Sequence, residues 1–366
     1  MENNNLAINA KVSNGKMETK VNKQYITQFL NGSVNENQLE LIYKKVISQN
    51  GHDKKFTFID LFAGIGGIRA PFEKLGGKCV FTSEWDLNSQ KTYLSNFGEI
   101  PNGDITSIPV DEIPPHNILL GGFPCQAFSV AGYRRGFEDT RGTLFFSIAK
   151  ILEYHRPSAF LLENVKGLKN HDKGHTYSKI IQVLKELDYE VFVEVLNSMT
   201  HANIPQNRER IIFVGFKKGL LKERFEFPDK MKLTKTIHEF LEKDRKDNKY
   251  YYNENHIYYN TLKATVKSKD TIYQWRRKYV RENKNKVCPT LTANMGTGGH
   301  NVPIILDNFG IRKLTPRECA NFQGFPKNFM LPNLPDSKLY YQIGNSVTVP
   351  LIERVAKHIV KYLSKD

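Results

Sequence analysis

From Phe56 onward the chain alternates short apolar runs with amphipathic segments. The apolar runs are FTFID, KCVFTSE, NILLGG, AFLLENV, EVFVEVL and RIIFVGF. Between them, Leu144 to Tyr154 and Tyr177 to Leu187 carry apolar residues at the spacing of one helix face. Strands that are apolar throughout are typical of sheets covered on both faces. The pattern therefore predicts βαβ units and an α/β fold with a doubly wound parallel sheet.

Both ends of the chain show a different pattern. Residues 1 to about 22 are rich in Asn at their start and predict a flexible tail. Residues 38–49 carry apolar side chains at helical spacing, which predicts a small helical appendage. The segment from Pro350 to Leu363 predicts a final helix that could return to the sheet.

The stretch 217–286 is strongly basic. It contains 20 Lys and Arg against 10 Asp and Glu, and so supplies +10 of the net charge of +15. This composition predicts a second domain, although a length of 366 residues also permits one large domain. The excess charge suggests a polyanionic partner, with nucleic acid as the first candidate, but basic surfaces also occur without such a function. The aromatic residues set among these charges are Tyr250, Tyr251, Tyr252, Tyr258, Tyr259, Tyr273, Trp275 and Tyr279.

Cysteine usage and hydropathy argue against two classes of protein. Cys79, Cys125, Cys288 and Cys319 lie far apart and form no CxxC pair or Cys/His cluster, so we expect no structural metal. No apolar run reaches the length of a signal peptide or a membrane span. We expect a cytoplasmic protein with reduced thiols and no membrane partner.

The run from Phe58 to Gly67 has the pattern of a strand that enters a glycine-rich turn. Glycines let a backbone turn tightly and approach a ligand closely, which predicts a site for a nucleoside cofactor. A turn that serves only tight packing is the alternative. The Gly-x-Gly-x-x-Gly pattern of nicotinamide-binding proteins is incomplete, because Arg69 stands at the third glycine.

Three side chains that follow the next runs fit such a cofactor. Glu84 lies 20 residues after Gly64, at the end of a run where a carboxylate can bind ribose hydroxyls. Trp85 could stack on an adenine or belong to the core. Asp104 could accept from the adenine amino group or cap a turn.

A second set of candidates has the residue types of a reactive site. Cys125 lies in a loop rich in Gly and Pro, although a single cysteine is more often a small buried residue than a nucleophile. Glu163 ends an apolar run at the edge of the sheet where α/β folds bind ligands, or caps the next helix. Arg208 and Arg210 would lie on one side of an extended strand. There they could hold a phosphate or a base carbonyl, or join a surface ion-pair network.

Six motifs resemble, in order and spacing, those of bacterial restriction-modification C5-cytosine DNA methyltransferases. They are DLFAGIGG, GFPCQAFS, LLENVKGL, IPQNRERI, LTPRECANFQGFP and YQIGNSV, which together span about Phe56 to Asp366. The resemblance implies a Rossmann-like methyltransferase sheet in residues 56–225 and 338–366. It also implies a second, smaller, mostly irregular and β target-recognition domain with a hinge in residues 226–337. Residues 1–55 would form the tail and the helical appendage.

The resemblance implies transfer of a methyl group from S-adenosylmethionine to C5 of a cytosine flipped out of duplex DNA. Cys125 would add to C6, and Glu163 would hold or protonate N3. Arg210 would contact the base carbonyl, and Arg208 would support the loop or a phosphate. The residues implied at the cofactor are Asp60, Phe62, Ala63, Gly64, Gly66, Gly67, Glu84, Trp85, Asp104, Ile105, Pro124, Asn345, Ser346 and Val347.

The variable target-recognition region of this family coincides with the basic, aromatic stretch. Its arginines could read guanines in the major groove or contact phosphates. We expect a monomer that acts on double-stranded DNA and protects host DNA from a cognate restriction endonuclease. The residues expected at the DNA are Gln126, Arg276, Arg277, Arg281, Thr290 and Gly298.

Three other functions fit parts of the sequence. An RNA cytosine methyltransferase would share the scaffold, but that branch of the family has a shorter recognition region and a Cys-Phe-Thr motif that is absent here. A DNA-binding regulator without catalysis would not need Cys125, Glu163 and Arg210 together. An unrelated nicotinamide-dependent enzyme ranks last.

Overall fold

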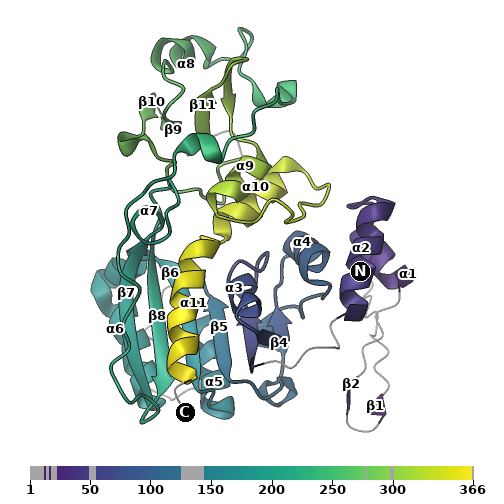
Figure 1. The fold of residues 1–366 in the computed structure, drawn as a ribbon, viewed down its shortest axis with the longest axis vertical. Helices are drawn as coiled ribbons and strands as arrows, with labels where there is room; N and C mark the ends of the chain where they lie inside the picture. The colour runs from purple at the N-terminus through teal and green to yellow at the C-terminus, as the bar shows by residue number, and fades with distance from the viewer. Residues whose placement is uncertain are drawn as a thin grey trace.

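The computed structural model of the protein describes residues 12–13, 16–17, 23–48, 55–124, 144–276, 278–296 and 301–364. At its centre lies a six-stranded sheet with strand order β4-β3-β5-β6-β8-β7 (Figure 1). The first four strands of this order are parallel, whereas β8 runs antiparallel to both of its neighbours. The strands are β3 (Phe56–Leu61), β4 (Gly77–Ser83), β5 (Ile118–Gly122), β6 (Ala159–Val165), β7 (Tyr189–Asn197) and β8 (Glu209–Lys217).

The predicted doubly wound α/β fold is confirmed, with one difference at β8. The connection from β7 to β8 contains only the short helix α7 (Ser198–His201). Antiparallel neighbours can be joined by so short a segment, whereas a parallel pair needs a crossover of about a dozen residues or more. An apolar run reads the same in either direction, so the reversal of β8 is not visible in its pattern.

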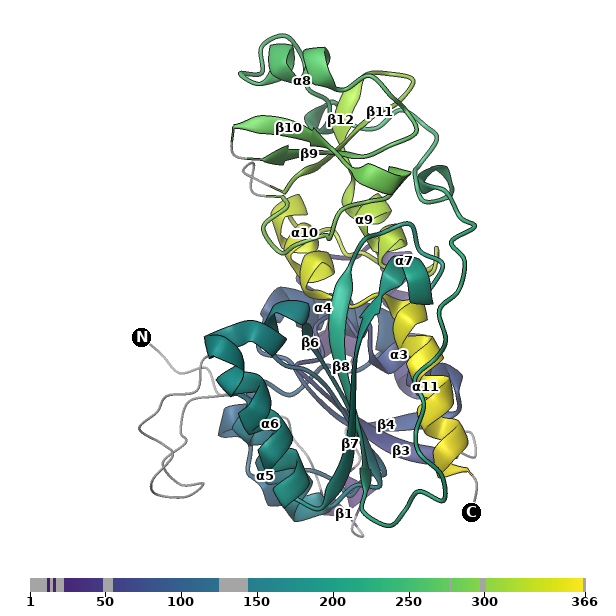
Figure 2. The same ribbon diagram turned by 90° about the vertical axis from the view of Figure 1, so that its left-hand side faces the viewer.

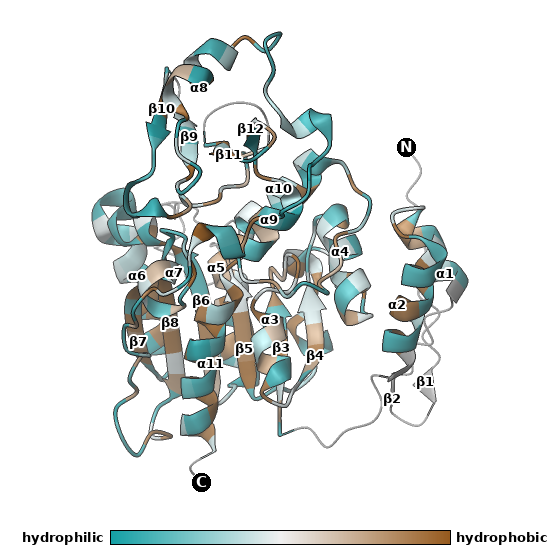
Figure 3. Cartoon of the chain, turned by 45° about the horizontal axis from the view of Figure 1, so that its top comes forward, coloured by the Kyte–Doolittle hydropathy of each residue, from teal (hydrophilic) through white to brown (hydrophobic). Residues whose placement is uncertain are grey.

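Helices cover both faces of the central sheet (Figure 2). On one face, α5 (Leu144–His155) and α6 (His175–Glu186) pack against apolar side chains of β3, β5, β6 and β8. On the other face lie α3 (Arg69–Lys74) and the predicted final helix, α11 (Val349–Leu363). In α11 the buried residues Leu351, Val355 and Ile359 recur every fourth position, which places them on one side of the helix. The brown, apolar residues of Figure 3 are accordingly concentrated on the central strands.

A smaller antiparallel sheet with order β10-β9-β11-β12 lies at one end of the molecule (Figure 1). It has its own apolar core around Trp275, Val280 and Ile304. The helices α9 (Pro316–Phe322) and α10 (Asp336–Asn345) lie between this sheet and the central one. The remaining elements here are β9 (Tyr273–Arg276), β10 (Tyr279–Glu282), β11 (Pro303–Leu306), β12 (Ile311–Lys313) and α8 (Tyr259–Thr265).

The N-terminal part forms two helices, α1 (Lys23–Leu30) and α2 (Glu36–Ser48), after two short strands, β1 (Val12–Ser13) and β2 (Lys16–Met17). The predicted helix at 38–49 is α2, while α1 was not predicted. Together, α1 and α2 pack on α4 (Leu87–Phe97), which follows β4 in the central domain.

Short 3-10 helices complete the secondary structure. Within the described ranges, no helix is long and apolar enough to cross a membrane. The 3-10 helices span Ile105–Ser107, Val110–Glu112, Lys166–Gly174, Ile237–Glu239, Asn248–Tyr250 and Lys284–Lys286.

Candidate active site

The turn after β3 has a backbone and surroundings that require glycine. Gly64 and Gly66 have φ values of +55° and +82°, in the left-handed region where glycine is favoured. A Cβ on Gly66 would lie 2.0 Å from the ring of Phe97, and one on Gly67 would lie 2.7 Å from Ser346 Oγ. The turn, which begins at Phe62 and Ala63, is therefore packed closely by α4 on one side and by the segment after α10 on another.

Glu84 fastens this turn from the end of β4. Its Oε2 accepts from Gly64 N at 2.7 Å, and its Oε1 accepts from Asp86 N at 2.8 Å. The carboxyl group is buried, and this desolvation raises its pKa, while hydrogen bonds from backbone N–H groups act in the opposite direction. A carboxylate has about four acceptor positions, so Glu84 keeps capacity for ligand hydroxyls.

Trp85 lies beside Glu84 and is 73% exposed, so it is not a core residue. The segment that carries Asp104 is held nearby, because Glu84 N donates to Asn102 O at 2.8 Å. Asp104 is exposed next to the buried Ile105, and it caps the following 3-10 helix by accepting from Thr106 N at 2.9 Å. The turn-capping role considered from the sequence is therefore present, and the exposed indole offers a face for stacking.

Asp60, which was expected among the cofactor contacts, is instead buried beneath the turn at 1% exposure. Its Oδ2 accepts from Tyr93 OH at 3.3 Å, and Tyr93 OH accepts from Arg69 at 2.9 Å. Arg69 also forms an ion pair with Glu99 at 2.6 Å. Burial raises the pKa of Asp60 well above its usual range, although Arg69 opposes the shift. Asp60 thus links β3 to α3 and α4, and it has little surface left for a ligand.

The end of α10 returns to the glycine-rich turn. Ser346 Oγ and a Val347 methyl group are the two atoms nearest to a Cβ built on Gly67. Asn345, the last residue of α10, is exposed. The structure therefore brings together two predicted segments, 62–67 and 345–347, that are far apart in the sequence.

The loop that contains Cys125 begins beside Glu163. Strand β5 ends at Gly122, which pairs with Glu163 in parallel register, and a Cβ on Gly122 would lie 3.7 Å from Glu163 Oε2. The buried Asn164 donates from Nδ2 to Phe123 O at 2.8 Å and so fixes the backbone as it leaves the strand. Pro124 is exposed, and Cys125 and Gln126 lie outside the described residues.

Glu163 and Arg210 form a buried ion pair. Arg210 Nε lies 2.8 Å from Glu163 Oε1, across the antiparallel strands β6 and β8. Desolvation raises the pKa of Glu163, and the positive charges of Arg210 and Arg208 limit this shift. A carboxyl group with a raised pKa can donate a proton to a base at a pH where an exposed carboxyl group cannot.

Arg208 differs from Arg210 although only one residue separates them. It is 1% exposed and donates to Leu291 O at 2.7 Å, to Gly344 O at 3.1 Å and to Ser346 O. It thus ties the start of β8 to the segment that contains Leu291 and to the end of α10. Of the two roles expected for Arg208, the structure supports the loop and not the phosphate, because a phosphate contact would require this buried link to break.

Sequence reasoning missed two neighbours of Arg208. Gln206 is buried and donates to Phe322 O at 2.7 Å, while its Oε1 accepts from Leu291 N at 3.2 Å. Asn207 donates from its backbone N to Cys288 O at 2.9 Å. Both residues lie in the IPQNRERI motif, but in that motif the sequence indicated roles only for Arg208 and Arg210. These bonds join the residues before β8 to α9 and to the segment that contains Cys288 and Leu291.

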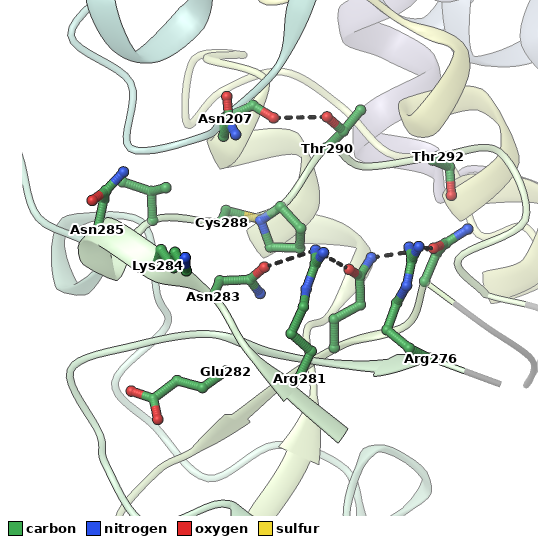
Figure 4. Close-up of a pocket in the computed structure, with 14 residues that line it drawn as sticks. Asn207, Arg276, Arg281, Glu282, Asn283, Lys284, Asn285, Cys288, Thr290 and Thr292 are labelled. Atoms are coloured by element: carbon green, nitrogen blue, oxygen red, sulfur yellow. Dashed lines mark hydrogen bonds between the residues drawn. The ribbon is translucent and has the colours of Figure 1, made fainter. Parts of the chain in front are cut away.

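A cavity of about 610 Å³ lies between the β9–β10 hairpin and the segment before β8 (Figure 4). Three residues that were expected at the DNA line it, namely Arg276, Arg281 and Thr290. Thr290 Oγ1 donates to the main-chain oxygen of Asn207 at 2.7 Å, so this wall of the cavity is continuous with the QNRER motif. Arg277 and Gly298 lie outside the described residues. Elsewhere in the described chain, no group of three or more His, Cys, Asp and Glu side chains could hold a metal ion.

Comparison with known proteins identifies the family. The family model described as C-5 cytosine-specific DNA methylase matches residues 56–361. The chain belongs to this family. The predicted resemblance and the enzyme class, a C5-cytosine DNA methyltransferase, are therefore confirmed. Helices α1 and α2 precede the matched region.

Individual relatives of this C5-cytosine methylase cover most of the chain. Type II methyltransferase M.Bsp6I of Bacillus sp. (strain RFL6) is 50% identical over 306 residues, which cover 82% of this chain and 97% of that protein. M.HpaII of Haemophilus parainfluenzae is 43% identical over 327 residues, which cover 85% of this chain and 90% of its own. The crystal structure of S. pombe Dnmt2 methyltransferase has the same fold, with a TM-score of 0.66 at 19% identity, over 84% of this chain and 98% of that one.

Proposed function

We propose that this C5-cytosine DNA methyltransferase uses S-adenosylmethionine and forms a covalent bond between Cys125 and C6 of a cytosine flipped from duplex DNA. The observation that carries the proposal is the buried Glu163–Arg210 pair beside the start of the Cys125 loop. The pair places an acid and a cation at the carboxyl edge of the sheet, where α/β folds bind ligands.

The residues at the glycine-rich turn fit a nucleoside cofactor. Phe97 and Ser346 leave no room for a side chain at Gly66 or Gly67. Only glycine at these two positions lets the turn keep this packing. Glu84 would accept from ribose hydroxyls, and the exposed Trp85 would stack on the adenine. When bound there, S-adenosylmethionine supplies an electrophilic methyl group.

Cys125 and Glu163 would divide the activation of the base between them. The Cys125 thiolate forms a bond to C6, and the C5–C6 electron pair shifts toward C5 while Glu163 protonates N3. C5 would then take the methyl group as the bond from the methyl carbon to the sulfonium sulfur breaks, which leaves S-adenosylhomocysteine. Loss of the C5 proton to a base expels the thiolate, the C6–S bond breaks, and N3 returns its proton to Glu163. Arg210 would contact the O2 carbonyl as negative charge develops on the ring.

The target must leave the duplex for this chemistry, because C6 is not accessible to a nucleophile within the base stack. The net charge of +15 supports a phosphate-rich substrate, for which affinity should fall steeply with added salt. We further propose that the protein acts as a monomer on a short specific sequence. Methylation there would protect host DNA from a cognate restriction endonuclease.

Labelled S-adenosylmethionine and plasmid DNA, followed by bisulfite sequencing, test the proposal. We expect label in DNA, and methylated cytosines in one sequence context. Cys125→Ser should abolish transfer but retain duplex binding, because a serine hydroxyl is a much weaker nucleophile than a thiolate. Normal turnover of Cys125→Ser would contradict the covalent mechanism. Label in transfer RNA but not in DNA would contradict the substrate.

A further inference from the structure

We propose that Arg276 and Arg281 read guanines close to the target cytosine, and that Gln274 and Asn301 are positioning residues that hold these two arginines. The inference rests on the proposed function, because it takes duplex DNA as the substrate. It goes further by assigning base identity to two named side chains and a positioning role to two others.

The four side chains meet at one face of the small sheet. In the β9–β10 hairpin, Arg281 pairs with Gln274, and Arg276 lies two residues beyond Gln274 on the same strand. Side chains directly opposite, and two apart along a strand, share a face. The other face of the hairpin packs Trp275 and Val280 into the small apolar core. This packing fixes the hairpin and turns the arginine face toward the cavity (Figure 4).

Neutral amide oxygens hold both guanidinium groups. Arg281 donates to Gln274 Oε1 at 2.8 Å, and Arg276 donates to Asn301 Oδ1 at 2.7 Å. Gln274 Nε2 links the two halves by donating to Asn301 Oδ1 at 3.4 Å. Because the acceptors are uncharged, the bonds orient the arginines without neutralising them. Figure 4 shows the Glu282 carboxylate on the side of the hairpin away from both guanidinium groups.

The positioning residues are themselves fixed. Gln274 is 2% exposed. Asn301 has φ +70°, a conformation that Asn tolerates better than most residues, and its backbone N donates to Trp275 O at 3.0 Å. An anchored amide network of this kind is more than a phosphate contact requires, since a mobile lysine can neutralise a phosphate from many directions.

The hydrogen-bonding capacity of this face matches guanine better than adenine. Guanine presents two acceptors, N7 and O6, in the major groove, and a guanidinium group with five N–H donors can serve both while keeping an amide contact. Adenine is read by the free oxygen and nitrogen of an Asn or Gln amide. Gln274 is buried and bonds to Arg281 and Asn301 through its two amide atoms, so its amide edge is not presented to a base.

The reading face is connected to the catalytic strand through short contacts. Thr290 and Asn207 line the same cavity and are hydrogen-bonded to each other at 2.7 Å. Arg208, next in the chain, holds Leu291 O at 2.7 Å, and Arg210 contacts Glu163. The guanines read by the hairpin should therefore lie within a few base pairs of the cytosine that reaches Glu163.

The first test uses the unaltered full chain and modified DNA. Once bisulfite sequencing has identified the recognition sequence, single guanines in a duplex oligonucleotide are replaced by 7-deazaguanine, which lacks the N7 acceptor. Loss of the N7 hydrogen bond to a charged donor should lower kcat/KM by about 5- to 150-fold at the guanines that Arg276 and Arg281 read. If every such replacement leaves kcat/KM unchanged, or if the sequence contains no guanine near the target, the inference is overturned.

Variants then connect each guanine with its arginine. Arg276→Ala and Arg281→Ala should each relax selectivity at one guanine and abolish the 7-deazaguanine effect there. The control, Lys284→Ala, removes an exposed positive charge from the same cavity and should weaken binding uniformly across sequences. Gln274→Met and Asn301→Gly should relax the same positions while the salt dependence of binding is retained, because they leave the charges in place.

The outcomes separate the inference from the proposed function. If Arg276→Ala and Arg281→Ala lower methylation equally on all sequences, the arginines contact phosphates, and only the guanine assignment fails. If the unaltered protein methylates no DNA, the proposed function fails, and the guanine assignment fails with it. If a variant does not fold, the 7-deazaguanine series still tests the guanine contacts, because it needs no substitution in the protein.

Discussion

The Glu163 carboxylate and the Arg210 guanidinium meet at 2.8 Å between β6 and β8, with side chains only 10% and 12% exposed. Removing two charges from water costs several kcal/mol per ion, and close contact recovers only part of that cost. At Glu163 the two effects oppose each other, and burial exceeds attraction, so the pKa of the carboxyl group is raised. Burial thus raises the pKa of the acid, while Arg210 limits that shift and fixes the orientation of the carboxyl group.

Glu163→Gln should slow methyl transfer by about 10²–10⁴-fold, because an amide cannot pass a proton to N3 of the base. The rate of the unaltered enzyme should fall as the pH rises through the raised pKa of Glu163, since only the protonated form donates. Single-turnover rates measured across a pH series check both expectations.

The matched control for this change is Glu209→Gln, which removes a half-exposed carboxylate paired with Lys166 near the same end of β8. It should leave the single-turnover rate close to that of the unaltered enzyme. Loss of DNA affinity in Glu163→Gln with a normal rate of chemistry would assign Glu163 to binding instead.

Gly66→Ala should weaken binding of S-adenosylmethionine by at least about tenfold, because the left-handed φ and the Phe97 ring at 2.0 Å both oppose a Cβ. Isothermal titration calorimetry measures the affinity. Adding Phe97→Ala to this variant should restore part of the affinity, since the clash is removed while the backbone strain stays.

Gly103→Ala is the control, because a Cβ there would meet open space. If Gly66→Ala binds S-adenosylmethionine as tightly as Gly103→Ala and the unaltered protein do, the turn does not contact the cofactor.

The positions of the candidate site residues could be predicted from the sequence because each stands where a strong local pattern ends. Glu163 closes an apolar run, and the run itself indicates a buried strand whose end lies at the ligand-binding edge of the sheet. The glycine-rich turn was predictable for a related reason, since Gly64, Gly66 and Gly67 directly follow an apolar run.

Arg208 and Gln274 could not be assigned in this way. Arg208 is indistinguishable from Arg210 in the sequence, and its buried role depends on carbonyl groups supplied by Leu291 and Gly344. Gln274 of β9 bonds to Asn301, which lies two residues before β11, and no local pattern specifies the pairing of these two strands. Helix α1 was also not predictable from its own sequence, because few of its side chains are buried and those pack against α2 and α4.

The buried His116 should make stability depend on pH in the acidic range. Burial lowers the pKa of His116 from 6.5 to about 4, against a hydrogen bond with Pro114 O at 2.9 Å. The folded protein therefore keeps this ring neutral while the unfolded chain takes up a proton, so stability is lost as the pH falls from 6.5 toward 4. The full effect amounts to about 3 kcal/mol.

Chemical denaturation at a series of pH values measures how the free energy of unfolding depends on pH. His116→Asn should reduce the slope of that dependence between pH 6.5 and 4. The variant His238→Asn, at an exposed position, controls for loss of a histidine. An unchanged slope in His116→Asn would assign the acid sensitivity to other groups.

The N-terminal helices should support the cofactor site through α4. Ile42 is fully buried among Ile26, Leu30 and Leu94, whereas its neighbour Leu41 is 54% exposed. Ile42→Ala should weaken the packing of α1 and α2 by about 2–5 kcal/mol, while Leu41→Ala should change it by less than about 0.5 kcal/mol.

Hydrogen exchange in α1 and α2 measures this loss directly. Lys45 donates to main-chain oxygens at the end of α4, at 3.3 Å and 3.1 Å, and Phe97 of the same helix packs on Gly66. The affinity for S-adenosylmethionine should therefore fall in Ile42→Ala and stay unchanged in Leu41→Ala. Faster exchange in Ile42→Ala without any loss of cofactor affinity would separate the appendage from the site, because α4 would then hold the turn without help from α2.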